Sequence, residues 1–389
     1  MSGPLSGLVV TELARALAGP QAGMMLGDLG ARVIKVEAPG TGDDTRSWGP
    51  PFVGSAAERE STYFLSCNRN KESITLDLKS PAGREVLSRL IERSDVLIEN
   101  FRPEVLDRLG FGDAAREALN PRLVTLSITG FGHDGPESSR PGYDQVLQGE
   151  AGLMSVTGPE PGQPTRVGVP IGDLLAGMNG AFGVLAALRE REVTGRGAVV
   201  RTSLLASVIG AHAFHGTAYT VAGVVPAAGG NHHPTLVPYG LFHCRDGAVQ
   251  VAVGSESLWR RFAPLAGIDP ADERFSSNEA RLARRGELHE LIERAFGPLD
   301  VTALLSQLEQ AGVPAGQVRT LDQVYQWAQT LSQGLVIEVD HATLGPIALP
   351  GSPLRFDGAP SARHLAPPVL GQHNESVRQW LGLGERVPS

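Results

Sequence analysis

Cysteine is scarce in this sequence. Only Cys67 and Cys244 occur among the 389 residues, which excludes a disulfide framework and favours a reducing, cytoplasmic compartment. Neither thiol has the spacing of a metal-ligand motif. The opening residues, MSGPLSGLVV, also lack the basic region and long apolar core of a signal peptide, so we expect none.

Positive charge is also in short supply. The formal net charge is −8, which argues against a nucleic-acid partner, because polyphosphate binding requires a concentrated basic face. Charge of either sign is missing from 202–244, where an apolar run contains His212 and His215. We interpret this stretch as a buried core or subunit-interface helix, and no membrane association is expected.

Several catalytic signatures are missing as well. The chain has no P-loop lysine, no Gly-x-Ser-x-Gly elbow and no Gly-x-Gly-x-x-Gly after its first expected strand, where it reads ARALAGPQAG. The segment PGTGDDTR (39–46) is glycine-rich but does not open a helix, so we interpret it as a loop. The sequence therefore lacks the glycine motifs that bind phosphate groups in nucleotide-binding proteins.

Strands and helices alternate over the first 200 residues. We expect strands over 7–13, 31–37, 95–100 and 122–129, with helices over 20–30 and 80–94, the latter with Ser80 as N-cap and Pro81 in its first turn. This alternation predicts an open α/β fold with a mostly parallel, Rossmann-like sheet.

The pattern changes after about residue 225. Two β-type runs flank Arg245-Asp246-Gly247 and predict a hairpin, and helical patterns follow at 256–266, 282–297 and 301–311. These features predict a second, smaller α+β domain. Short β runs resume at Leu335, and the tail ends in a helix.

Asp173 is the most informative acidic residue. It lies between the apolar run VGVPIG and an apolar, glycine-spaced helical pattern. As an N-cap it would accept hydrogen bonds from the first helical turn. As a nucleophile it would be kept ionised by the same N–H groups. The pattern alone leaves both interpretations open.

The histidines invite a metal interpretation, because His212 and His215 precede the segment GNHHP (230–234). No carboxylate lies near them in sequence. We therefore interpret them as core or interface residues, and expect no metal site. The glycine-led segment reads as a loop that either covers a site or joins two domains.

The chain resembles the class III CoA-transferase family, which includes formyl-CoA transferase, carnitine CoA-transferase and the divergent α-methylacyl-CoA racemases. The likeness extends over nearly the whole chain. It rests on PLSGLVVTEL…LAGPQAGMMLGDLGARVIKVEAPGTGDDTR (4–46), NRNKESITLDLKSPAGREVLSRLIERSDVLIENFRPEVLDRLG (68–110), GYDQVLQGEAGL (142–153), GDLLAG (172–177), TGRG (194–197) and PVLGQHNESV (368–377).

The resemblance implies a domain arrangement and an assembly. A large CoA-binding domain would span 1–200 and be completed by 335–389, with a linker at 201–225. A small α+β domain would span 226–325, and 326–389 would contain the return linker and the rest of the large domain. Two chains would form an interlocked homodimer.

The resemblance also implies a reaction. Asp173 would attack an acyl-CoA donor to form an aspartyl anhydride and then an aspartyl-CoA thioester, before CoA passes to an acceptor acid. Coenzyme A and acyl-CoA would be substrates, with no permanently bound cofactor. A mobile loop at Gly229, Gly230, Asn231, His232 and His233 would shield the intermediate from water.

The resemblance places a set of residues around CoA. The expected CoA-binding residues are Leu17, Ala18, Leu76, Lys79, Asn100, Phe101, Arg102, Arg108 and Tyr143. Among them Lys79, Arg102 and Arg108 supply the positive charge that the CoA phosphates require, although each also fits a solvated surface position.

Departures from the family pattern narrow the expected substrate. Formyl-CoA transferase has Gln where this chain has Leu17 and Arg where it has Ala38, which favours a larger dicarboxylate or a hydrophobic acid over oxalate or formate. Tyr143 stands where the racemases carry a catalytic His. This replacement favours transfer over a racemase-type isomerisation, in which Asp173 would act as a base.

Overall fold

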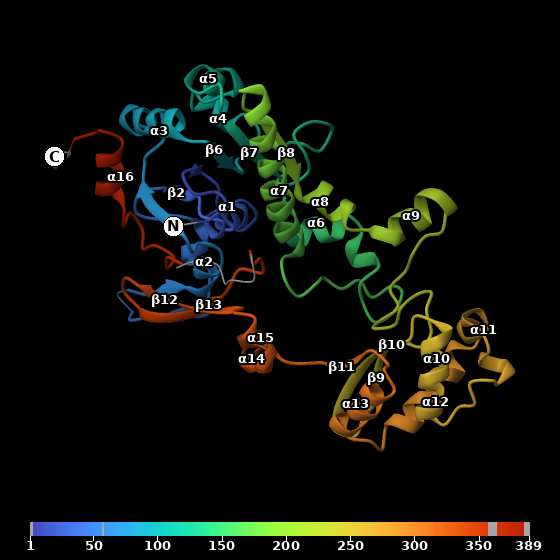
Figure 1. Cartoon of the computed structure of the whole chain (residues 1–389). Coiled ribbons are helices and arrows are strands. Elements are labelled where there is room, and N and C mark those ends of the chain that lie inside the picture. Colours follow the sequence, from blue (N-terminus) through green and yellow to red (C-terminus); the bar gives the residue numbers. More distant parts are fainter. Residues whose placement is uncertain (1–2, 57, 357–363, 385–389) are drawn as a thin grey trace. The chain divides into compact units, whose positions relative to one another are not determined.

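A computed structural model describes residues 3–56, 58–356 and 364–384. The described chain divides into two compact units, the first containing residues up to 153, 166–224 and 328 onward, and the second containing 154–165 and 225–327. The tail expected to complete the large domain includes 357–363 and 385–389, which lie outside the described residues. Figure 1 labels the elements of both units.

The first unit is built on a six-stranded parallel sheet in the order β5-β2-β1-β6-β7-β8. Its strands are β1 (Val9–Glu12), β2 (Arg32–Glu37), β5 (Lys71–Thr75), β6 (Val96–Glu99), β7 (Val124–Thr129) and β8 (Val199–Ser203). Every residue of β6 and β7 is buried, as expected for parallel strands with both faces covered. The parallel α/β prediction is confirmed.

Two apolar layers enclose this sheet. One joins strand residues such as Val33 and Ile98 to the helices α1 (Ala18–Asp28) and α7 (Ile171–Thr194). The other joins Ile34 and Leu97 to α3 (Pro81–Arg93) and α16 (Asn374–Trp380). Neighbouring strand residues therefore face opposite layers, as the two-residue period of a strand requires.

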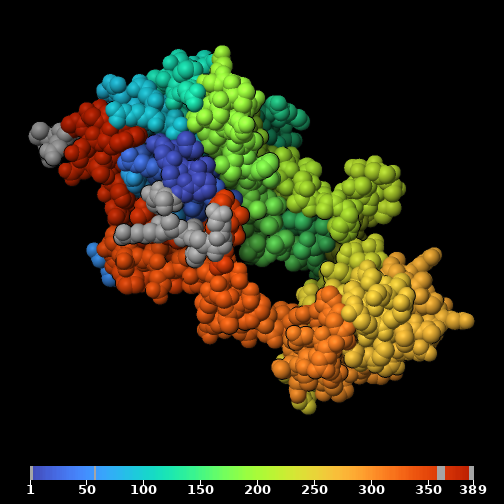
Figure 2. Space-filling view, in the orientation of Figure 1, coloured from blue at the N-terminus to red at the C-terminus, as the bar shows by residue number. Residues whose placement is uncertain are grey.

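Smaller elements complete the first unit. They are η1 (Asp44–Ser47), β3 (Phe52–Val53), β4 (Glu60–Ser61), α2 (Thr62–Cys67), α4 (Val105–Arg108), α5 (Asp113–Leu119), α6 (Asp144–Glu150), α8 (Leu204–Gly210), α9 (Ala213–Ala222), α15 (Ala328–Ser332), β12 (Val336–His341) and β13 (Gly345–Pro350). The C-terminal residues return to this unit, where Asn374 Oδ1 accepts a 2.8 Å hydrogen bond from Thr75 N, and Figure 2 shows them, in red, beside the blue N-terminal residues.

The second unit is α+β. The strands β9 (Tyr239–Cys244) and β10 (Gly247–Ala252) form the expected hairpin, and β11 (Ala315–Gln317) extends the sheet. The described part of this unit also contains the α-helices α10 (Glu256–Phe262), α11 (Asn278–Ala283), α12 (Arg285–Phe296), α13 (Val301–Gln310) and α14 (Leu321–Gln326), with the short 3-10 helices η3 (Ala263–Ala266) and η4 (Glu273–Phe275). Residues 154–165 also belong to this unit, because Gly230 N donates to Gly158 O at 2.9 Å, a pairing between segments far apart in sequence.

Two apolar segments differ from their expected form. The uncharged stretch after residue 202 contains the two short helices α8 and α9, and α9 has no buried residue, so the core interpretation is wrong for α9. Helix α7 has the length and composition of a membrane span. Its buried side contains Ala176, Gly180 and Val184 and packs in the sheet core, so α7 is a core helix of this unit.

Candidate active site

A cavity of about 610 Å³ lies in the first unit, at the carboxyl ends of the central strands. The strand order reverses between β1 and β6, and such a reversal is where open α/β sheets bind ligands. Arg15 and Ala16 follow β1 in this lining, and Asn100 and Phe101 follow β6. Segments 138–145 and 166–173 contribute further residues to the lining.

The two loops after β1 and β6 are joined directly. Arg15 N donates to Asn100 Oδ1 at 2.9 Å, and Asn100 Nδ2 donates to Arg15 O at 2.7 Å. The next residue, Ala16, has φ of +64°, an uncommon conformation for a residue with a Cβ. Its N–H donates to Asp43 Oδ1 at 3.2 Å. Segment 15–16, called the floor of the cavity below, is thus held in place by hydrogen bonds to side chains from other elements.

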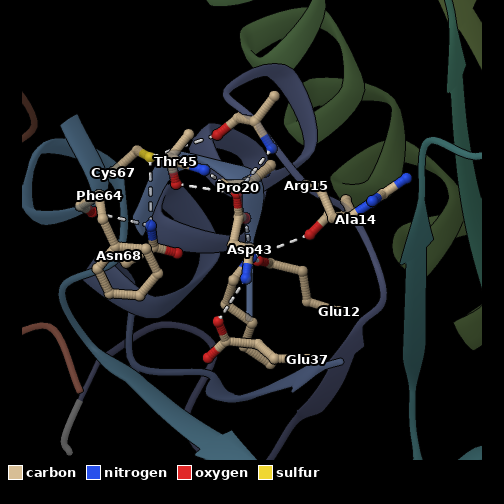
Figure 3. A network of polar contacts seen from close by, with 12 residues as sticks. Glu12, Ala14, Arg15, Pro20, Glu37, Asp43, Thr45, Phe64, Cys67 and Asn68 are labelled. Atoms are coloured by element: carbon tan, nitrogen blue, oxygen red, sulfur yellow. Dashed lines mark hydrogen bonds and ion pairs between the residues drawn. The ribbon is translucent and has the colours of Figure 1, made fainter. Parts of the chain in front are cut away.

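A buried network of charges supports this floor (Figure 3). Lys35 Nζ lies 2.8 Å from Glu12 Oε1 and 2.8 Å from Asp43 Oδ2, and it donates to Ala14 O at 2.9 Å. Lys71 Nζ lies 2.9 Å from Glu12 Oε2 and donates to Pro20 O at 2.8 Å. The two ammonium groups therefore bind carbonyls at both ends of segment 14–20.

The network continues through Arg46. Arg46 pairs with Glu37 at 2.7 Å and lies 3.7 Å from Glu60, and Asp43 N donates to Glu37 Oε2, so the described residues of the network include four carboxylates and three cations. Burial alone would raise the pKa of Asp43, but Lys35 outweighs it and lowers that pKa to about 2. A buried ion network of this kind orders the groups it contacts, although it adds little net stability over an apolar core.

Asp173 lies in the first turn of α7, which begins two residues earlier at Ile171 and has Pro170 as its N-cap. The N-cap interpretation of Asp173 is therefore wrong. Asp144 performs that role from α6: its Oδ1 accepts a 2.7 Å hydrogen bond from Gly172 N, and its Oδ2 accepts one of 2.7 Å from Gln148 Nε2. A carboxylate distant in sequence therefore accepts a hydrogen bond from a backbone N–H group that has no partner within the helix.

The Asp173 carboxyl group is unpaired. Within the described part of the chain, no hydrogen bond or ion pair engages its oxygens, and the side chain is half-buried in the cavity wall. Burial and the adjacent Asp144 carboxylate raise its pKa to about 7. Tyr63 faces the same cavity, and burial together with Asp173 raises the pKa of its hydroxyl. Asp173 is therefore a carboxylate that is costly to ionise in this cavity wall.

Helix α7 lies unusually close to the N-terminus of α1. A Cβ added at Gly177, one turn after Asp173, would meet Ala18 O at 2.7 Å and Gln21 Cβ at 2.9 Å. Glycine is required here because two helix backbones approach closely. This contact brings the first turn of α1 next to the helix that carries the Asp173 carboxylate.

The structure brings together only part of the expected CoA set. Ala18, Asn100, Phe101, Arg102 and Tyr143 line the Asp173 cavity. The remaining four lie elsewhere: Leu17 is buried, Leu76 lines a different cavity, and Lys79 and Arg108 are exposed on the surface.

The expected substrate loop, Gly229 to His233, lies in the second unit. His232 stacks on His289 with ring centroids 4.1 Å apart, and His233 N donates to Tyr239 O at 2.8 Å. Arg285 donates to His233 O at 3.0 Å. In the described residues, no three His, Cys, Asp or Glu side chains form a group that could hold a metal ion.

Sequence reasoning missed several cavity residues. Asp144 and Gln148 lie within segment 142–153, to which the sequence alone assigned no separate role. Tyr63, Arg140 and Arg166 also line the cavity. Nothing local in the sequence distinguishes these residues from surface ones, since their positions depend on how α6, α2 and segment 166–170 pack.

Comparison with known proteins assigns the family. A model of CoA-transferase family III matches residues 5–374. The chain belongs to CoA-transferase family III.

Curated relatives and a solved structure agree with this family. Succinyl-CoA:glutarate CoA-transferase of Mus musculus is 38% identical over 96% of this chain and 85% of its own length. Acetyl-CoA:oxalate CoA-transferase of Acetobacter aceti is 36% identical over 98% of this chain and 97% of its own. A crystal structure of a CAIB/BAIF family protein from Brucella suis has a TM-score of 0.88 and 39% identity, covering 98% of this chain and 100% of that one.

These findings establish the reaction class. The chain is a family III CoA-transferase, which acts between an acyl-CoA and a carboxylic acid. The sequence-based prediction of this family and of this enzyme class is confirmed.

Proposed function

We propose that Asp173 is the nucleophile of the transfer. Its carboxylate oxygen attacks the thioester carbonyl of the donor, the C–S bond breaks, and an aspartyl anhydride and CoA thiolate form. The thiolate then attacks the aspartyl carbonyl, which releases the donor acid and leaves an aspartyl-CoA thioester. An acceptor carboxylate then attacks the aspartyl-CoA thioester, and the same steps run in reverse. No proton is gained or lost, and in each step one activated acyl bond is replaced by another.

The observation that carries this proposal is a comparison of the three described carboxylates that line the cavity, of which only one has no partner. Asp44, Asp144 and Asp173 line the cavity. Asp44 pairs with Arg15 at 3.4 Å, and Asp144 is occupied with the N-terminus of α7. Asp173 alone is unengaged within the described residues, and its raised pKa makes its ionised form the more basic and more reactive nucleophile.

The cavity surroundings support a place for CoA. We place the thioester near Ala18, at the first turn of α1, where helical N–H groups stabilise developing negative charge. Asn100, Phe101, Arg102 and Tyr143 then line the route of the pantetheine and phosphates. Leu17, Leu76, Lys79 and Arg108 join this set by the family resemblance alone. The same resemblance assigns Gly229 to His233 the role of shielding the intermediate from water.

We also propose that the working enzyme is an interlocked homodimer in the cytoplasm. Helix α9 is apolar yet has no buried residue, and Tyr219, Val221 and Phe182 are 59%, 80% and 74% exposed. Apolar surface of this extent favours a covering partner. Light scattering at twice the chain mass is the expected result, and a monomer at working concentration would contradict it.

The names of the relatives support a choice of substrates. Those relatives act on succinyl-CoA with glutarate and on acetyl-CoA with oxalate. We propose a dicarboxylic acid larger than oxalate as acceptor, with succinyl-CoA as donor.

The experiment is peptide mass spectrometry after the enzyme is mixed with succinyl-CoA and quenched with hydroxylamine or borohydride. We expect the modification on the peptide that carries Asp173 and not on the one that carries Asp144, which is the matched cavity carboxylate. Solvent deuterium entering the α-carbon of a bound acyl-CoA, with no adduct, would instead indicate the racemase-type isomerase in which Asp173 acts as a base.

A further inference from the structure

The described residues of the cavity include arginines that lie outside the expected CoA-binding set. Four arginines line it: Arg15, Arg102, Arg140 and Arg166. Arg15 pairs with Asp44 at 3.4 Å, and Arg140 pairs with Glu137 at 3.0 Å and Glu150 at 2.6 Å. Within the described residues, Arg102 and Arg166 have no carboxylate partner. Two positive charges in the cavity therefore remain available to a ligand.

The two available cations come from different segments. Arg102 follows β6 and belongs to the residues proposed above to line the route of CoA. Arg166 lies in segment 166–170, which leads directly into the first turn of α7 and Asp173. Arg166 Nη1 donates only to backbone carbonyls of its own segment, Val167 O at 3.1 Å and Gly168 O at 2.9 Å. Its remaining N–H donors have no protein acceptor in the described chain.

The segment that carries Arg166 shares its support with Asp173. Val167 N donates to Gln148 Oε1 at 2.8 Å, and Gln148 Nε2 donates to Asp144 Oδ2 at 2.7 Å. The other oxygen of Asp144 accepts from Gly172 N. Gln148 is fully buried. One buried pair therefore anchors both the arginine segment and the start of the nucleophile's helix, which fixes their separation.

We propose that Arg166 binds the distal carboxylate of a dicarboxylic acyl group while its other end reacts at Asp173. This inference rests on the proposed function. A guanidinium binds a carboxylate through two parallel hydrogen bonds, so a cation in the segment that leads into the Asp173 helix would select dicarboxylic over monocarboxylic substrates. The apolar Pro170, in the same lining, suits the short methylene chain between the two carboxylates.

The test compares succinyl-CoA with butyryl-CoA, which has the same chain length and a methyl group in place of the distal carboxylate. kcat/KM is measured for each donor with one common acceptor, so that the ratio cancels the acceptor step. We expect Arg166→Gln to lower kcat/KM for succinyl-CoA by about 10- to 100-fold, the range for a lost charge-assisted hydrogen bond. The value for butyryl-CoA should stay within about 3-fold, and Arg166→Lys should keep part of the selectivity.

Two arginine variants provide matched controls. Arg140→Gln removes a cavity cation that already has carboxylate partners, so the donor ratio should not change. Arg102→Gln should raise KM for both donors alike. An equal effect of Arg166→Gln on both donors, no effect on either, or loss of selectivity in Arg102→Gln instead would each overturn the proposal.

A separate variant tests whether Asp173 is the nucleophile. An Asp173→Asn variant that transfers CoA as fast as the wild type would overturn the covalent route, and it would leave the donor ratio of Arg166→Gln readable. A wild type that shows no preference for succinyl-CoA over butyryl-CoA would overturn the Arg166 subsite alone.

Discussion

Asp173→Asn should make the protein more stable at neutral pH while abolishing transfer. The wild-type side chain has a pKa of about 7, raised from 3.8 by burial and then by Asp144. The unfolded chain therefore ionises this group near pH 4, whereas the folded chain ionises it near pH 7. Ionisation in the folded state is the unfavourable step, and asparagine removes it without changing the shape of the side chain.

The magnitude follows from the size of the pKa shift. At about 1.4 kcal/mol per pKa unit, the shift corresponds to roughly 4 kcal/mol as an upper limit. Because Asp173 is only half-buried, we expect a gain of about 2–4 kcal/mol at pH 8. A raised carboxyl pKa costs stability as pH rises from the unfolded value to the folded value. The gain should therefore be near zero at pH 4, grow up to about pH 7, and stay constant above it.

Thermal unfolding of both proteins from pH 4 to pH 8 measures this gain as a difference in Tm. Asp44→Asn is the matched control, because Asp44 also lines the cavity but pairs with Arg15 at an exposed position. Its effect should stay within about 0.5 kcal/mol at every pH. A difference for Asp173→Asn that does not vary with pH, or a less stable variant at pH 8, would refute the reasoning about its ionisation.

Three further predictions concern Asp173 and the residues around it. kcat/KM should rise as the pH passes about 7, because Asp173 ionises there. In Asp144→Asn the midpoint of the pH–rate profile should move to lower pH, because a like charge next to Asp173 is removed. An unmoved midpoint would contradict this. Lys35→Met should lose about 3–5 kcal/mol by urea unfolding at pH 7, because it leaves buried carboxylates uncompensated, and the loss should shrink as acid protonates them; a loss independent of pH would count against the ion network. Gly177→Ala should lose about 1–3 kcal/mol, since its Cβ meets Ala18 O and the helix-propensity gain of about 1 kcal/mol does not compensate; a more stable variant would show that the helices separate freely.

Local patterns determined most of the elements. The Ser80 N-cap and Pro81 start α3 as expected, with Ser80 Oγ accepting from Gly83 N. The hairpin of β9 and β10 turns at Arg245 and Asp246. Each of these features depends on residues a few positions apart, and such interactions are visible in a linear sequence.

The start of α7, in contrast, cannot be found from local spacing. An acid before an apolar helical pattern usually caps it, and Asp173 fits that rule by local spacing. The helix starts two residues earlier because Asp144, 28 residues before Gly172, supplies the capping oxygen. No window of neighbouring residues contains that information.

By itself, the sequence determined that this is a parallel α/β protein of CoA-transferase family III with a distinctive acid at position 173. Only the tertiary structure decided the chemical state of that acid. Burial, the Asp144 carboxylate and the lack of a protein partner within the described residues set its pKa, and the packing of α1 on α7 and the network around Lys35 shape the cavity that it faces. Solvation and charge depend on which distant groups come together in space, and the order of residues does not state this directly.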